Sequence, residues 1–310
     1  MVNTSSGRCV AQPMMRPYDI RRYSLIGRIN PADCFAITVP EQGGLSAEVA
    51  GLGSVLVVMD FSIGLDDDHF LAGLVASRAG DLLLALRNKA FSEGVPGREL
   101  KSLGDRTAHN YLVECLLAMR PGDAVLSEEG VDDGSRLNAN RIWIIDPLDG
   151  TQDYSRPESV EWAVHVALVV DGEPVAGAVA LPAGGGLYGT LQSPISGQSL
   201  RERPVVVTSR SQWGYAENVA NAIGGEVHAF GSAGVKAMAV VSGIADVYIH
   251  PSGLYEWDAC APVAVARAVG LDAMGVDGSD LVFNKSHPVV PGLLISRPEL
   301  TERVSTILHS

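Results

Sequence analysis

The sequence lacks the features of several protein classes. Its four cysteines are scattered at Cys9, Cys34, Cys115 and Cys260, and no two of them form a CxxC pair. We therefore expect neither a disulfide framework nor a zinc site built on paired cysteines. Scattered cysteines of this kind are typical of reduced thiols in a cytoplasmic protein.

Positive charge is also scarce. Lys and Arg number 23 against 36 Asp and Glu, which gives a net charge of −13. There is no basic stripe of the kind that nucleic-acid binding needs. The longest apolar candidate for a membrane span, Val55–Met59, is far shorter than the about 18 residues required. We expect neither a nucleic-acid polymer nor a membrane as partner. An acidic protein that acts on an anionic substrate needs local positive charge, which a metal usually supplies.

Residues 1–58 differ from the remainder of the chain. They are rich in Gly, Ser, Pro and Arg, show no sustained period, and lack the basic and apolar regions of a signal peptide. We interpret them as a disordered extension or as the result of a start codon assigned too early, with Met59 as the candidate start. An ordered N-terminal extension is the alternative.

Regular patterns follow this segment. Apolar spacing predicts helices over residues 66–88 and 106–119, joined by a loop that holds "GVPGRELKSLGD". The stretches "DAVLSEE" and "RIWII" read as strands, and "WAVHVALVV" and "PVAGAVALP" as a hairpin around Asp171–Gly172. After a surface connection near 191–204, strands and helices alternate to the end.

This order of elements predicts a layered α/β (α+β) protein. With 310 residues and 46% hydrophobic content, the chain can bury a full core in one large domain or two lobes. We expect an N-terminal α+β lobe over 59–200 that carries a metal site. The C-terminal α/β lobe over 201–310 is expected to supply substrate contacts.

Acidic residues follow three strand or helix boundaries. Glu128 comes after "VLS", Asp146 and Asp149 come after "WII", and Asp258 lies in the first turn of a helix. No His or Cys stands beside any of them in the sequence. A set of oxygen ligands suits a hard cation such as Mg²⁺ better than zinc. Solvated or helix-capping acids are the alternative for any one of these residues alone.

The segment "DPLDGT" concentrates this chemistry. Pro147 fixes φ and forces a turn after the strand. Asp146, Asp149 and the Leu148 carbonyl can then point to one place and share a cation.

The two residues that follow suit a phosphate. Gly150 lets the backbone approach a bound group closely, and Thr151 suits the start of a helical turn whose free N–H groups bind phosphate. Thr151 and a further carboxylate such as Asp105 could hold an attacking water. Two divalent ions could clamp the two oxygens of an in-line phosphoryl transfer.

A second anion contact is suggested by "GSAGVKAM". Ser232 stands at a helix start and Lys236 lies four residues later, so together they could hold a second phosphate of a bisphosphate substrate. The alternative is a capped helix with a solvated lysine. His165, on an alternating strand, is expected to be a packed core or surface histidine.

Three motifs resemble one family. "LSEE", "WIIDPLDGT" and "EWDACAP" are similar to the signature of the inositol monophosphatase superfamily of Mg²⁺-dependent, lithium-sensitive phosphatases. The resemblance runs from about Asp66 to the end of the chain. It implies a layered αβαβα sandwich of the inositol monophosphatase and fructose-1,6-bisphosphatase type. Within the superfamily, the chain most resembles the CysQ-type 3′(2′),5′-bisphosphate nucleotidases of actinobacteria.

The resemblance also implies roles for single residues. It implies a set of ligands for two or three Mg²⁺ ions: Glu128, Asp146, Asp149, Asp258 and the Leu148 carbonyl. It implies that Asp105 and Thr151 orient the nucleophilic water, and that Gly150 and Thr151 contact the phosphate. It favours substrate binding at Ser232 and Lys236.

The reaction implied is removal of the 3′-phosphate of 3′-phosphoadenosine 5′-phosphate (PAP), a by-product of sulfate assimilation. Alternatives are a phosphatase of inositol-1-phosphate or fructose-1,6-bisphosphate, and a non-catalytic protein that binds metal or phosphate. "GRELKSLGD" lacks the Pro-Val-Thr that precedes the helix aspartate in many nucleotidases, which leaves water geometry and lithium sensitivity open. Homodimers are usual among such proteins, but no interface is evident in the sequence.

Overall fold

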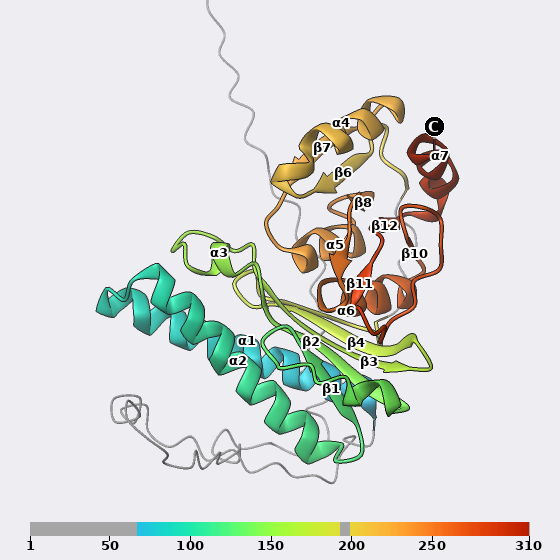
Figure 1. The fold of residues 1–310 in the computed structure, drawn as a ribbon. Helices are drawn as coiled ribbons and strands as arrows, with labels where there is room; N and C mark the ends of the chain where they lie inside the picture. Colours follow the sequence, from blue (N-terminus) through green and yellow to red (C-terminus); the bar gives the residue numbers. More distant parts are fainter. Residues whose placement is uncertain (1–66, 193–198, 310) are drawn as a thin grey trace, which may run out of the picture. The chain divides into compact units, whose positions relative to one another are not determined.

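Alternating layers of helices and sheets make up the computed structural model, which describes residues 67–192 and 199–309 (Figure 1). The predictions for residues 1–58, including a start at Met59, lie outside the described residues. The described residues from Asp68 to His309 belong to one compact unit.

Two long helices form the first layer. The helices α1 (Asp68–Glu93) and α2 (Gly97–Met119) contact each other, and α1 also contacts the first sheet through β3 and β4. Among the described helices, α1 alone is long and apolar enough to cross a membrane. Its residues Leu71, Val75 and Leu83 are fully buried in the cluster shared with that sheet, so α1 packs here as a core helix.

The first sheet has the order β1-β2-β3-β4-β5. Its strands are β1 (Ala124–Ser127), β2 (Arg141–Asp149), β3 (Ala163–Val170), β4 (Glu173–Leu181) and β5 (Gly186–Gly189). β1 runs parallel to β2, and the other pairs are antiparallel. The predicted hairpin between β3 and β4 is confirmed, with Asp171 and Gly172 both at positive φ as a tight turn requires. Helices cover both faces of this sheet, which explains the nearly continuous apolar sequence of β3.

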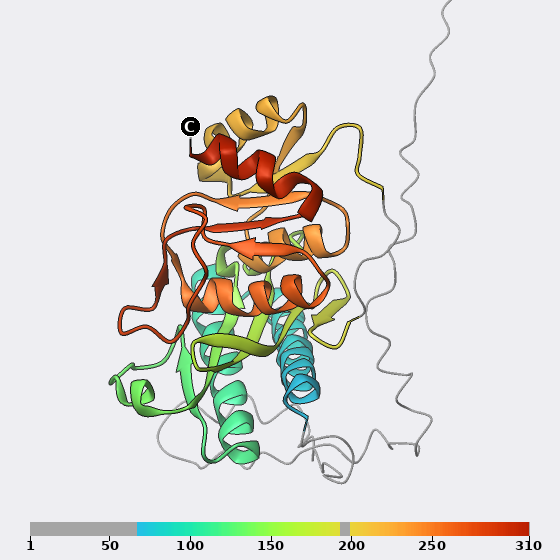
Figure 2. The same ribbon diagram turned by 90° about the vertical axis from the view of Figure 1, so that its right-hand side faces the viewer.

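The helices α5 (Ala233–Val241) and α6 (Glu256–Ala268) form the central layer. Figure 2 shows α6 lying between the two sheets, and both helices contact strands of each. Their sequences are rich in small residues, and these let the sheets approach closely: a Cβ at Gly177 in β4 would lie 3.1 Å from the Ala264 methyl in α6.

The second sheet has the order β10-β12-β8-β6-β7. Its strands are β6 (Val205–Thr208), β7 (Glu226–Ala229), β8 (Val247–His250), β10 (Asp272–Met274) and β12 (Leu293–Ser296), and β9 (Leu254–Tyr255) pairs separately with β11 (Val289–Val290). The outer helices are α4 (Trp213–Ala222) and α7 (Pro298–Leu308), which share a buried cluster with this sheet. The resulting layers are α, β, α, β and α, which confirms the predicted fold class.

One predicted boundary is wrong. The second helix begins at Gly97 and not near residue 106, so the expected loop "GRELKSLGD" is its first turns and Asp105 lies within the helix. Gly104 and Asp105 resemble a helix start in the sequence. However, Arg98, Glu99 and Leu100 are good helix formers, and Leu100 is fully buried against the core. The two described cysteines, Cys115 and Cys260, are buried free thiols, as predicted.

Candidate active site

A bulge in β2 places two acidic side chains on the same side of the sheet. Asp146 lies opposite His165 on β3, whereas Asp149 lies opposite Ala163, so three steps along β2 match two along β3. Residues three apart in a regular strand face opposite sides, and one extra residue corrects this. The turn expected at Pro147 is therefore a bulge, and β2 continues through Asp149.

Three carboxylates converge at this bulge. Ligand oxygens of Asp146, Asp149 and Asp258 all lie within 4.8 Å of one another. Asp146 and Asp149 are buried, and Asp258 comes from the first turn of α6. Glu128, just after β1, lies close enough to Asp146 for each side chain to affect the pKa of the other. The donor set consists of carboxylate oxygens, the ligands that hard divalent cations prefer, so the residues present fit such a metal.

The acids raise one another's pKa. Burial raises the pKa of Asp258 to about 7, and the Asp149 carboxylate adds to the shift. Burial, followed by the charges of Glu128 and Asp149, raises the pKa of Asp146 well above its usual range. A buried group of acids with such pKa values binds either protons or a cation. The site is therefore built to receive positive charge.

Asp149 is the exception, because it is surrounded by donors. The Ser232 hydroxyl donates to Asp149 Oδ2 at 2.5 Å, the Gly234 N–H donates to the same atom at 2.7 Å, and His165 Nε2 lies 3.2 Å from it. Burial alone would raise the pKa of Asp149. His165, followed by Lys236 and Ser232, lowers it instead to about 2.

His165 is the site residue that sequence reasoning missed. Its side chain is fully buried, as one alternative expected, but it faces Asp149 and not an apolar neighbour. Burial alone would lower its pKa, yet the adjacent Asp149 carboxylate raises it. The one available signal was a single histidine inside the otherwise apolar stretch "WAVHVALVV".

Gly150 and Thr151 begin the short helix α3 (Thr151–Tyr154). Gly150 has φ of 85°, and a Cβ there would lie 2.6 Å from the Glu161 carbonyl oxygen, so a larger residue would not fit. The Thr151 hydroxyl donates to the Leu148 carbonyl oxygen at 3.1 Å and lies close enough to Asp105 to lower the pKa of that carboxyl group. The structure thus places Asp105 and Thr151 near each other, and their role in holding a water stays a prediction.

Asp105 has an unusual pKa for a carboxyl group on a helix. Burial raises it to about 7, and the charges of Glu129 and Glu128 act in the same direction. The charge of Lys101 and the nearby Thr151 hydroxyl oppose this shift. Asp105 can therefore accept or release a proton near neutral pH.

Lys236 is not the solvated lysine of one alternative, and its predicted contact with a phosphate stays a prediction. It is 1% exposed, so it is not solvated. Its ammonium donates to the Gly231 and Phe230 carbonyl oxygens at 3.0 and 3.4 Å and lies 5.5 Å from the Tyr248 ring centroid. Burial lowers its pKa to about 8. In this geometry the ammonium donates to two backbone carbonyl groups, and this arrangement does not favour a direct contact with a phosphate.

Ser232 likewise faces inward. It is fully buried, and its hydroxyl accepts a hydrogen bond from the Val235 N–H while it donates to Asp149. Its contacts are those of a helix cap and of a support for Asp149. The substrate contact predicted for Ser232 stays a prediction.

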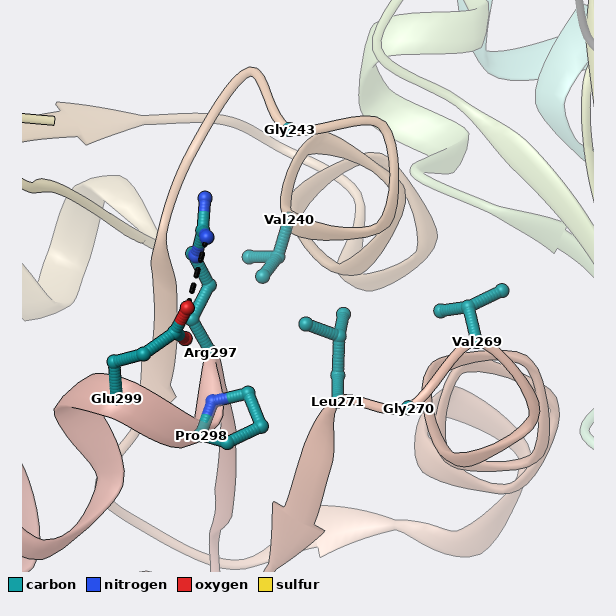
Figure 3. Close-up of a pocket in the computed structure, with 8 residues that line it drawn as sticks. All are labelled: Val240, Gly243, Val269, Gly270, Leu271, Arg297, Pro298 and Glu299. Atoms are coloured by element: carbon teal, nitrogen blue, oxygen red, sulfur yellow. Dashed lines mark hydrogen bonds and ion pairs between the residues drawn. The ribbon is translucent and has the colours of Figure 1, made fainter. Parts of the chain in front are cut away.

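A separate surface pocket of about 220 Å³ lies between α5, α6 and the start of α7 (Figure 3). Val240, Val269 and Leu271 give it an apolar floor, and Arg297 pairs with Glu299 at its edge. No predicted site residue lines this pocket. The carboxylate cluster, and not this pocket, carries the candidate chemistry.

Comparison with known proteins agrees with this geometry. A model of the inositol monophosphatase family matches residues 70–310. The chain belongs to the inositol monophosphatase family. Enzymes of this family are metal-dependent phosphomonoesterases. In this chain, the cluster of Asp146, Asp149 and Asp258 could hold the metal.

One relative is the 3′-phosphoadenosine 5′-phosphate phosphatase of Mycobacterium leprae. It is 40% identical over 247 residues, which cover 75% of this chain and 90% of that protein. Two solved structures share the fold. CysQ from Bacteroides thetaiotaomicron matches with a TM-score of 0.60 at 25% identity and covers 74% of this chain and 96% of its own. Staphylococcal IMPase-II matches with a TM-score of 0.65 at 20% identity, with shares of 78% and 93%.

Proposed function

We propose that this protein hydrolyses the 3′-phosphate of PAP and releases AMP and phosphate. The observation that carries the proposal is the 40% identity with a mycobacterial PAP phosphatase across 90% of that relative. The acid cluster supplies the chemistry that such hydrolysis needs. A cytoplasmic location, a role linked to sulfate assimilation and a homodimer remain predictions.

The proposed metal ligands are those that the sequence suggested. Asp146, Asp149 and Asp258 would hold Mg²⁺, with Glu128 and the Leu148 carbonyl as further ligands, and two or three ions are expected. When bound, the metal neutralises phosphate charge and makes a water molecule more acidic. Raised pKa values at Asp146 and Asp258 support this role, because cation binding displaces their protons.

Asp105 and Thr151 are proposed to hold the attacking water. Their side chains lie close enough for Thr151 to affect the pKa of Asp105, so one water molecule could contact both. The water is thereby oriented toward the phosphorus, and Asp105 can take its proton. The backbone N–H groups of Gly150 and Thr151, at the start of α3, are proposed to contact the phosphate oxygens.

Ser232 and Lys236 are proposed to support the site from behind. Ser232 holds Asp149, and Lys236 holds the carbonyl groups of the segment that leads into α5. Both affect the substrate through the backbone that they fix. A direct phosphate contact by Lys236 would require its ammonium to leave these carbonyls.

The test is phosphate release with Mg²⁺ from PAP, inositol-1-phosphate and fructose-1,6-bisphosphate side by side, with and without lithium. PAP is expected to be the best substrate by kcat/KM, and lithium is expected to inhibit. The Asp105→Asn variant serves as the control for contaminating phosphatases. Equal or better turnover of either competitor would overturn the nucleotidase assignment and leave the phosphatase assignment standing.

A further inference from the structure

The His165 side chain lies between two proposed metal ligands. It contacts Asp149 and the residue that precedes Asp258. It is fully buried on β3, with Nδ1 3.1 Å from the Trp257 carbonyl oxygen and Nε2 3.2 Å from Asp149 Oδ2. Trp257 immediately precedes Asp258 at the start of α6. We propose that His165 is a positioning residue that fixes Asp149 and Asp258 relative to each other, an inference that rests on the proposed metal site.

The neighbours of the ring show how it does so. A backbone carbonyl faces one ring nitrogen and a carboxylate faces the other, and both groups are acceptors. Because a carbonyl oxygen can only accept, Nδ1 carries a hydrogen and donates to Trp257, while Nε2 lies against Asp149. One rigid side chain thus connects the end of β2 to the first turn of α6.

Two donors at one carboxylate oxygen also orient Asp149. The Ser232 hydroxyl and the Gly234 N–H donate to Oδ2, and His165 Nε2 lies 3.2 Å from the same atom. With Oδ2 occupied in this way, Oδ1 is the oxygen left to face a cation. Supports of this kind around a metal ligand typically change metal affinity when they are removed.

Gly234 shows that the fold makes room for this ring. A Cβ at Gly234 would lie 2.2 Å from His165 Nε2 and 2.9 Å from the Ala163 methyl. Any larger residue at this position would push the ring or α5 away. The first turn of α5 is therefore matched to a histidine on β3.

The test measures metal affinity without substrate. Mn²⁺ is titrated into the metal-free protein, and free Mn²⁺ is followed by electron paramagnetic resonance. The amide nitrogen of His165→Asn can replace Nδ1, whereas that of His165→Gln can reach the position of Nε2. Each variant keeps one of the two contacts, so we expect both to weaken Mn²⁺ binding, by about 10- to 100-fold.

Two further variants keep the outcome interpretable. Val166→Ala shortens a buried side chain next to His165 that faces the α1 side of the sheet. This variant should lower the unfolding temperature and leave Mn²⁺ affinity unchanged. Gly234→Ala keeps His165 but crowds its ring, and it should weaken Mn²⁺ binding as His165→Asn does. Circular dichroism shows which variants are folded.

Wild-type Mn²⁺ affinity in a folded His165→Asn or Gly234→Ala variant would overturn the proposal. So would wild-type Mn²⁺ affinity in a folded His165→Gln variant, because one contact would then be enough and the ring would not connect the two ligands. If PAP is not hydrolysed by the wild type but Mn²⁺ affinity depends on His165 as expected, the proposed function fails and this inference stands.

Discussion

The Ser232 hydroxyl donates a hydrogen bond to Asp149 across 2.5 Å, although 83 residues separate them in the chain. The same hydroxyl accepts from the Val235 N–H and caps α5. One side chain therefore both begins a helix of the central layer and holds a carboxylate of the first sheet. The geometry of the acid cluster depends on how α5 packs against the bulged end of β2.

Removing this hydroxyl should destabilise the protein. Ser232→Ala loses the helix cap and leaves Asp149 with one donor fewer, and we expect a loss of about 2 kcal/mol in the free energy of unfolding. Urea denaturation measures it. Ser242→Ala is the control, since that hydroxyl donates to a carbonyl in the last turn of α5 at 3.3 Å and neither caps the start of a helix nor contacts Asp149. Equal losses in the two variants would contradict the account.

The pair formed by Asp105 and Thr151 should act as one unit. We expect Asp105→Asn and Thr151→Ala each to lower kcat by about 10²- to 10⁴-fold, because the water loses its orientation and its base. The double variant should be little worse than the poorer single variant. Steady-state kinetics on PAP measure this, and Mn²⁺ binding should be unchanged. Multiplicative losses would show that the two residues act separately.

Lys236→Met should destabilise the site without changing substrate preference. The variant keeps most of the buried volume but leaves the Phe230 and Gly231 carbonyls without their donor, which costs about 1–3 kcal/mol. Turnover of PAP and of inositol-1-phosphate should then fall by similar factors. A rise in KM confined to PAP would instead show that the ammonium binds a phosphate of the nucleotide.

The metal-free protein should lose stability as the pH rises. The pKa of Asp258 is about 7 in the folded protein and 3.8 as its ordinary value. Between these two pKa values, Asp258 is protonated in the folded state and ionised in the unfolded state. The contribution of Asp258 to stability is therefore complete below about pH 4 and is lost as the pH rises through about 7. Mg²⁺ should restore stability at about pH 8, because the cation replaces those protons.

Thermal unfolding with EDTA or Mg²⁺ across this range measures the effect. The Asp258→Asn variant is the control, and its metal-free form should show a flatter dependence on pH. His250 acts in the opposite direction, since burial lowers its pKa to about 4 and its contribution is lost as pH falls from 6.5. The stability difference between the metal-free wild type and Asp258→Asn should change between about pH 5 and about pH 8. An unchanged difference would contradict the raised pKa of Asp258.

Local sequence was enough to predict most elements and the convergence of Asp146, Asp149 and Asp258. Hydrophobic period and turn residues are local signals, and "DPLDGT" carries its own geometry. The bulge itself was not predicted, because it depends on the register with β3, and register is a property of two strands. The start of α2 was misplaced for a similar reason, since burial of Leu100 decides it.

The roles of His165 and Lys236 could not be predicted from the sequence. A histidine in an apolar strand can face a core, a surface or a carboxylate, and only the packing of α5 and α6 against β3 determines which. A lysine four residues into a helix is usually solvated. Here the helix lies between two sheets, and the carbonyls before α5 satisfy the ammonium.

The most direct measurement is ³¹P nuclear magnetic resonance of PAP incubated with the protein and Mg²⁺. The account predicts that the 3′-phosphate signal disappears while free phosphate appears and the 5′-phosphate remains, giving AMP. It also predicts that EDTA or Asp149→Asn abolishes the change. Release of the 5′-phosphate, or hydrolysis that continues with EDTA or in Asp149→Asn, would contradict it.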